Sequence, residues 1–127
     1  MSSPVPLTCL IVDDSRQFLE AARQLLEDDG MTVVGVAATA DEALATTLEL
    51  RPDVALVDLD LGAESGFDVA RRLAALSDGG PQVILISAES ETELAELVAA
   101  SGARGFISKT DLSVGEIERL LGHGGSS

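Results

Sequence analysis

The sequence predicts an α/β fold in which helices cover both faces of a single five-stranded parallel sheet. Two patterns lead to this prediction. Short apolar runs rich in β-branched residues alternate, five times, with stretches whose apolar residues recur at helical spacing. The central run, Val54 to Val57, is apolar throughout, as expected of a strand that helices cover on both faces.

Each predicted strand is followed by a predicted helix. The strands are expected at five apolar runs, residues 7–12, 31–36, 54–57, 83–86 and 104–108. Helical spacing follows them in the stretches 18–26, 40–48, 69–76, 94–98 and 117–121. Helix starts are marked by Ser15 and by the capping boxes that begin at Thr39 and Ser113. Right-handed crossovers between such units favour, at this length, the flavodoxin-like strand order 2-1-3-4-5.

Composition limits the class of protein. The 127 residues suit one domain, expected at residues 6–121, and the stretch 122–127 is expected to be a flexible polar tail. A net charge of −14 argues against a nucleic-acid surface, since phosphate contacts need an excess of Lys and Arg. The single Cys9 excludes an internal disulfide, and no stretch resembles a signal peptide or membrane span. We therefore expect a small acidic cytoplasmic protein without membrane contact.

Polar residues stand at the ends of four predicted strands. The first strand ends at Asp13 and Asp14, the third at Asp58, the fourth at Ser87 and the fifth at Lys109. Because the carboxyl ends of parallel strands share one edge, where open α/β sheets bind ligands, these side chains are expected to converge. Three carboxylates placed together need a compensating charge, and oxygen ligands without His or Cys suit Mg²⁺.

The same groups suit phosphoryl transfer. A carboxylate can accept a phosphoryl group covalently, and Asp58 is the best nucleophile because it stands alone after the central strand. Lys109 can pair with a phosphoryl oxygen, and Ser87 offers a hydroxyl. The adjacent Asp13 and Asp14 point in different directions, which suits them to a metal ion and its bound water.

These motifs resemble those of response-regulator receiver domains of two-component signalling, over residues 6–121. The matching residues are Asp13-Asp14, Asp58, Ser87-Ala88 and Lys109. The stretch 108–113 is similar to that of receivers which precede helix-turn-helix output domains. The resemblance implies that Asp58 takes a phosphoryl group from a histidine kinase or a phosphotransfer protein. It also implies that the domain is no enzyme beyond its self-catalysed phosphotransfer and dephosphorylation.

The resemblance further implies a metal site and a switch. The implied ligands of Mg²⁺ are Asp14, Asp58, the backbone carbonyl of Asp60 and, through water, Asp13. Ser87 is expected to move onto the phosphoryl oxygens while Phe106 changes rotamer. An output domain or protein partner is then expected to bind the surface of the fourth helix, fifth strand and fifth helix. A homodimer through that surface is a further expectation.

Two departures and two alternatives accompany the resemblance. Thr110 stands where many receivers carry proline, so the Lys109–Thr110 peptide bond is expected to be trans. Gly62 replaces another common proline. The Asp58-Leu-Asp60 pattern also resembles the nucleophile and acid of haloacid-dehalogenase phosphohydrolases, although Gly62 stands where that family carries Thr or Val. The second alternative is a receiver that binds partners without being phosphorylated.

Overall fold

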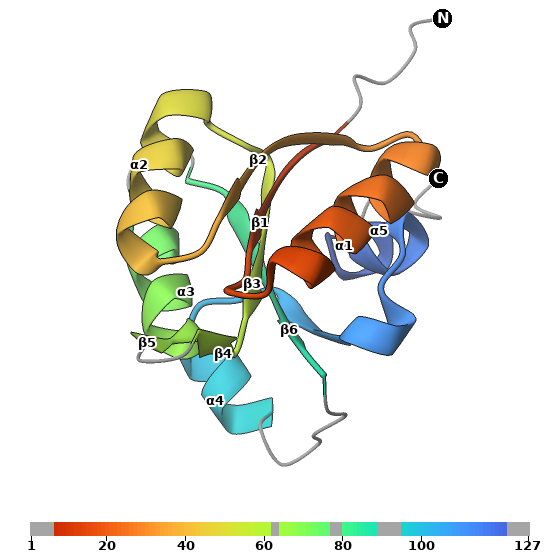
Figure 1. Cartoon of the computed structure of the whole chain (residues 1–127). Coiled ribbons are helices and arrows are strands. Elements are labelled where there is room, and N and C mark those ends of the chain that lie inside the picture. Colours follow the sequence, from red (N-terminus) through yellow and green to blue (C-terminus); the bar gives the residue numbers. More distant parts are fainter. Residues whose placement is uncertain (1–6, 62–63, 77–79, 89–94, 122–127) are drawn as a thin grey trace, which may run out of the picture.

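A computed structural model shows the expected three-layer α/β architecture (Figure 1). It describes residues 7–61, 64–76, 80–88 and 95–121, so the predicted tail at 122–127 lies outside the described residues. The main sheet consists of β1 (Thr8–Val12), β2 (Thr32–Ala37), β3 (Val54–Asp58), β6 (Gln82–Ser87) and β7 (Gly105–Ser108). All its strand pairs are parallel, in the order β2-β1-β3-β6-β7. This confirms the predicted fold class and strand order.

Helices lie on both faces of the sheet, with α1 and α5 together on one face (Figure 1). Their bounds are α1 (Arg16–Asp28), α2 (Ala40–Leu50), α3 (Gly66–Ala74), α4 (Ala95–Ala100) and α5 (Val114–Leu121). A short 3-10 helix, η2 (Lys109–Asp111), follows β7. None of the helices within the described ranges is long and apolar enough to cross a membrane.

The sheet separates two apolar cores. Along β1, Cys9 and Ile11 belong to the core under α1 and α5, whereas Leu10 and Val12 belong to the core under α2, α3 and α4. This alternation is the period of two expected along a strand. Because both faces are covered, β3 is buried at every position, including Asp58 at its end. The burial of Asp58 is therefore set by the central place of its strand.

The predicted helix starts are present. The Ser15 Oγ atom accepts a hydrogen bond from the Phe18 N–H at 3.3 Å, at the start of α1. At α2 the Glu42 N–H donates to Thr39 Oγ1 at 3.1 Å, and the Glu42 side chain accepts the N–H of Ala38, the residue before the cap, at 2.8 Å. These caps orient the first turns of α1 and α2, which both begin close to the carboxyl edge of the sheet (Figure 1).

The segment between β3 and α3 contains a short strand pair that was not among the five expected strands. Residues Asp60–Leu61 (β4) and Glu64–Ser65 (β5) pair as a two-residue antiparallel ladder. The Glu64 Oε1 atom accepts a hydrogen bond from the Ala40 N–H at 2.8 Å, which ties this ladder to the first turn of α2. Two-residue strands are too short to show an alternating apolar pattern, so no local sequence pattern predicts them.

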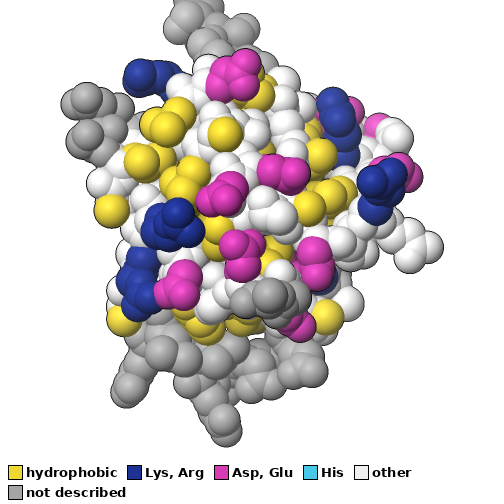
Figure 2. All heavy atoms as spheres, turned by 60° about the vertical axis from the view of Figure 1, so that its left-hand side comes forward, with side chains coloured by type: hydrophobic (Ala, Val, Ile, Leu, Met, Phe, Trp, Pro, Cys, Tyr) yellow, Lys and Arg dark blue, Asp and Glu magenta, His cyan; other side chains and the backbone are white. Residues whose placement is uncertain are grey.

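Acidic side chains are spread over the face shown in Figure 2, between apolar patches and separate basic side chains. That face includes α2, which presents the exposed Leu48 and Leu50. The basic side chains on it do not form the continuous stripe that nucleic-acid backbones require. The distribution agrees with the excess of acidic residues in the sequence.

The Thr47 hydroxyl is the basis of a stability prediction. Thr47 is 3% exposed on the buried side of α2, and its Oγ1 atom has no hydrogen-bond partner among the described residues. Thr47→Val is expected to raise the free energy of unfolding by about 1 kcal/mol, because it removes an unsatisfied buried hydroxyl at nearly constant volume. Urea unfolding measures the difference. The control is Thr46→Val, which changes a half-exposed neighbour and is expected to shift stability by less than about 0.5 kcal/mol. Equal effects of the two substitutions would contradict the prediction.

Candidate functional site

The residues predicted from the strand ends line one cavity at the carboxyl edge of the sheet. Its volume is about 350 Å³. Its lining consists of Asp13, Asp14, Ser15, Asp58, Asp60, Ser87, Ala88 and Lys109. Of the sequence-predicted site residues, Phe106 does not line this cavity. Phe106 lies in β7, is half-buried, and packs against the core under α2, α3 and α4.

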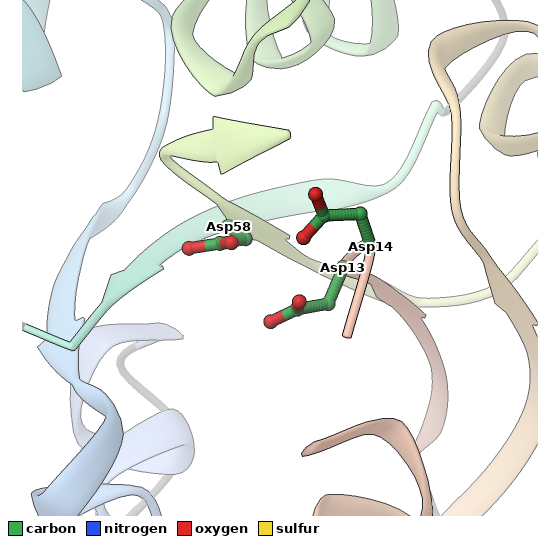
Figure 3. Close-up of side chains that lie close together, drawn as sticks. All are labelled: Asp13, Asp14 and Asp58. Atoms are coloured by element: carbon green, nitrogen blue, oxygen red, sulfur yellow. The ribbon is translucent and has the colours of Figure 1, made fainter. Parts of the chain in front are cut away.

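Three carboxylates meet in this cavity (Figure 3). Asp13 and Asp14 follow β1, Asp58 ends β3, and one carboxylate oxygen from each lies within 4.8 Å of the others. Asp13 is 0% exposed and Asp58 is 5% exposed, whereas Asp14 is open to solvent. Two buried acids and one exposed acid therefore share a site that a soluble ligand can enter.

The backbone fixes the positions of the two buried acids. The Asp13 N–H donates to the Ala37 carbonyl at 2.9 Å, which extends the β1–β2 ladder by one residue. The Asp13 Oδ1 atom accepts the Ser15 N–H at 2.8 Å, and this bond orients the carboxylate. Beyond Asp58, the Leu59 N–H donates to the Ile86 carbonyl at 2.9 Å. Asp13 and Asp58 are thus held by the sheet itself.

Lys109 supplies the positive charge. Its Nζ atom lies 2.6 Å from Asp13 Oδ2 and 3.6 Å from Asp58 Oδ2. The lysine side chain is only 18% exposed, so both ion pairs are shielded from bulk water. Lys109 begins η2, and the Lys109–Thr110 peptide bond is trans, as expected from the absence of proline. The hydroxyls of Ser108 and Thr110 lie 3.1 Å apart and bond across this turn.

Asp58 is a perturbed acid. The pKa of Asp58 is raised from its ordinary value of 3.8 to about 6, chiefly by burial and next by the Asp13 carboxylate. The Lys109 ammonium and the backbone N–H of Asp60 act in the opposite direction without cancelling the increase. The ionised Asp58 side chain is thus held at a cost in free energy that a second cation would relieve.

The donor set fits a hard divalent cation. Three carboxylates facing one ammonium leave excess negative charge, and all the ligand atoms are oxygens. The buried Asp13 Oδ2 atom accepts no well-oriented hydrogen bond from a described residue, so its ion pair with Lys109 is what compensates it. Asp60 and Ser87 border the same cavity and supply further oxygen atoms.

Two side chains around this site were not predicted to have a part in it. Phe18, expected only on the apolar face of a helix, places its ring centroid 4.2 Å from Lys109 Nζ. Glu64 anchors the β4–β5 ladder, which carries Asp60, to the start of α2. The pairing of an aromatic ring with a lysine 91 positions away has no local sequence signal.

Comparisons with known proteins agree with this geometry. The response regulator receiver domain family matches residues 9–118. The chain is 39% identical over 123 residues to protein-glutamate methylesterase/protein-glutamine glutaminase 5 of Myxococcus xanthus, covering 94% of this chain and 34% of that protein. It is 35% identical over 100 residues to the DNA-binding response regulator MtrA of Mycobacterium tuberculosis, covering 79% of this chain and 42% of that protein.

The fold has a solved counterpart in a CheY-like response regulator receiver domain protein from Methanospirillum hungatei, with a TM-score of 0.77 and 27% identity. That likeness covers 94% of this chain and 97% of the other. The chain spans between about a third and a half of the length of the first curated relatives it matches. Because the receiver family matches residues 9–118, the chain is assigned to that family and not to the haloacid-dehalogenase phosphohydrolases. The chain belongs to the response regulator receiver domain family of two-component signalling.

Proposed function

We propose that Asp58 accepts a phosphoryl group from a phosphohistidine of a histidine kinase or phosphotransfer protein. The observation that carries this proposal is the Lys109 ammonium, which lies 2.6 Å from Asp13 and 3.6 Å from Asp58 in a cavity lined by carboxylates. A nucleophilic carboxylate needs a cation beside it when an anionic phosphoryl group approaches. Asp58 is the buried acid that ends the central strand.

Asp58, Lys109 and Ser87 then take different parts in phosphoryl transfer. The Asp58 carboxylate attacks phosphorus while the bond from phosphorus to the donor imidazole breaks. Lys109 balances charge on the transferred group, and the hydroxyl of Ser87, which lines the same cavity, donates to a phosphoryl oxygen. The raised pKa of Asp58, about 6, still leaves it mostly ionised near neutral pH.

We propose Mg²⁺ as the cation for this site. The residues that would hold it are Asp14, Asp58, the Asp60 backbone carbonyl and, through water, Asp13. When bound, Mg²⁺ neutralises charge on the attacking carboxylate and on the phosphoryl oxygens. The excess of carboxylates over ammonium groups supports this assignment.

Signalling requires a second structural state. We propose that Ser87 and Lys109 form bonds to the phosphoryl group. These bonds stabilise a second state of the domain, in which Phe106 and the surface of α4, β7 and α5 have moved. Phe106 is half-buried against one apolar core, so its switch would work by packing, without a hydroxyl. The output of this cytoplasmic domain, residues 6–121, is then an attached domain or a protein partner, and a homodimer through the same surface is part of the proposal.

Chemical trapping tests which carboxylate accepts the phosphoryl group. After incubation with acetyl phosphate and Mg²⁺, borohydride reduces an acyl phosphate and marks the modified residue for peptide mass mapping. The expected mark is at Asp58. A mark at Asp13, Asp14 or Asp60 would contradict the assignment of the nucleophile.

Lys109→Ala separates acceptance of the phosphoryl group from the switch. The variant is expected to retain a phosphorylated form while losing the phosphorylation-dependent change at Phe106, since the ammonium no longer links the phosphoryl group to β7. Amide chemical shifts of the phosphorylated protein measure that change. The control is Arg23→Ala, an exposed cation of α1 that pairs with Glu27 at 3.5 Å outside the proposed switch surface, and it is expected to keep the change at Phe106. A full shift response in Lys109→Ala would contradict the role of Lys109.

A further inference from the structure

We propose that Phe18 is a positioning residue for Lys109, and that its ring face holds the lysine ammonium in the cavity during phosphoryl transfer. The juxtaposition is direct, because the Phe18 ring centroid lies 4.2 Å from Lys109 Nζ. Cation–π attraction acts within about 6 Å of a ring centroid and is strongest where water is excluded. The consequence for phosphorylation rests on the proposed function, whereas the contact itself does not.

Three groups surround the ammonium. Asp13 Oδ2 lies 2.6 Å from Nζ, Asp58 Oδ2 lies 3.6 Å from it, and the ring of Phe18 forms a third, uncharged side. The lysine side chain is 18% exposed and the phenylalanine is half-buried. The ring therefore occupies a side of the ammonium where water would otherwise compete for its N–H groups.

The position of the ring is tied to the carboxylate that binds the same ammonium. Asp13 Oδ1 accepts the Ser15 N–H at 2.8 Å, and Ser15 Oγ accepts the Phe18 N–H at 3.3 Å. These bonds set the first turn of α1, from which the ring reaches Lys109. A closed chain of contacts thus runs from Asp13 through Ser15 and Phe18 to Lys109, and back to Asp13.

The Phe18 ring can attract the ammonium without holding it next to one oxygen atom, which neither carboxylate can do. Lysine carries its charge on a flexible stem, and the shorter ion pair holds Nζ nearer to Asp13 than to Asp58. When a phosphoryl group arrives at Asp58, the ammonium must move toward it and loosen its bond to Asp13. Cation–π attraction does not require the fixed direction of a hydrogen bond. The ring face therefore still attracts the ammonium while Nζ moves from Asp13 toward Asp58, and it keeps the ammonium in the cavity.

A chemical shift tests the contact without any phosphorylation. Lys109 is the sole lysine of the sequence, so selective ¹³C-lysine labelling gives a single ε-CH₂ signal. In the wild type, its protons are expected to be shifted upfield by the ring current. Phe18→Leu is expected to remove that shift, and Phe18→Tyr, which retains the ring, is expected to preserve it. The control is Phe67→Leu, the same change at a half-buried phenylalanine that packs against the other core.

The rate of phosphorylation tests the consequence. With acetyl phosphate and saturating Mg²⁺, Phe18→Leu is expected to lower the rate constant about three- to tenfold, as expected for a partly shielded cation–π contact. Phe18→Tyr and Phe67→Leu are expected to stay within about twofold of the wild type, and the Mg²⁺ dissociation constant of Phe18→Leu is expected to be unchanged. A rate loss restricted to Phe18→Leu is not expected from a general loss of packing.

Three results would overturn the inference. The first is an ε-proton signal of Lys109 that does not respond to Phe18→Leu. The second is a rate constant that stays unchanged although the shift is lost. The third is an equal loss of rate in Phe67→Leu. A wild-type protein that forms no adduct would instead contradict the proposed function, and the chemical shift would still decide whether Phe18 positions Lys109.

Discussion

Asp58→Asn is expected to raise the free energy of unfolding by about 2 to 3 kcal/mol near neutral pH in metal-free buffer. The reason is the pKa of Asp58, which burial and the Asp13 carboxylate raise from 3.8 to about 6. Each unit of such a shift corresponds to about 1.4 kcal/mol between the folded and unfolded states. Asparagine has nearly the shape of the acid and cannot ionise, so it avoids this cost.

The pH dependence fixes the sign of the effect. Because its folded pKa lies above its unfolded pKa, Asp58 contributes stability below about pH 4, and this contribution is lost as the pH rises through about 6. The difference between wild type and Asp58→Asn is therefore expected to vanish near pH 4 and to reach its full size above about pH 7. Urea unfolding at a series of pH values measures it.

Mg²⁺ and an exposed acid provide the controls for this prediction. Mg²⁺ is expected to stabilise the wild type more than Asp58→Asn, since the amide supplies no charge to the ion. Glu49→Gln removes an exposed carboxylate of α2 and is expected to change stability by less than about 0.5 kcal/mol. A wild type more stable than Asp58→Asn in metal-free buffer near neutral pH would contradict the electrostatic account of the site.

Gly66→Ala is expected to lower the free energy of unfolding by about 3 kcal/mol or more. A Cβ atom at Gly66 would lie 2.7 Å from Leu59 Cα and 2.8 Å from the Asp58 carbonyl carbon, distances that backbone atoms cannot relieve without moving. The Gly66 N–H also donates to the Leu59 carbonyl at 2.9 Å. The end of β3 must therefore shift, and with it the Asp58 carboxylate. Weaker Mg²⁺ binding is expected beside the loss of stability.

Gly115→Ala is the matched control for this substitution. It makes the same chemical change in the first turn of α5, where the nearest atom to a new Cβ is Ser113 Oγ at 3.8 Å. Alanine favours a helix over glycine by up to about 1 kcal/mol, so Gly115→Ala is expected to leave stability unchanged or to raise it. Thermal unfolding of the two variants compares them directly. Equal stability of Gly66→Ala and the wild type would show that the backbone around Asp58 is not closely packed there.

Much of the site was predictable because the carboxyl ends of parallel strands lie at one edge of the sheet. Once the apolar runs identify parallel strands, topology alone brings Asp13, Asp14, Asp58, Ser87 and Lys109 to one edge. Their convergence does not depend on detailed side-chain packing. The strand order was predictable for the same reason, because few topologies satisfy right-handed crossovers between all five successive strands.

Other features of the site depend on packing that no local pattern records. The contact of Phe18 with Lys109 joins the first turn of α1 to the residue after β7, and helical periodicity could place the ring only on an apolar face. The bond from Ala40 to Glu64 depends on a ladder of two-residue strands. The raised pKa of Asp58 requires the burial and the distances of the folded protein.

Intact mass after incubation with acetyl phosphate shows whether Asp58 is the Mg²⁺-dependent phosphoryl acceptor. Four samples suffice, namely wild type and Asp58→Asn, each with Mg²⁺ and with a chelator. One base-labile phosphoryl adduct is expected, formed only by the wild type with Mg²⁺. An adduct of equal yield on Asp58→Asn, or one formed equally well without a divalent cation, would contradict Asp58 as the Mg²⁺-dependent acceptor.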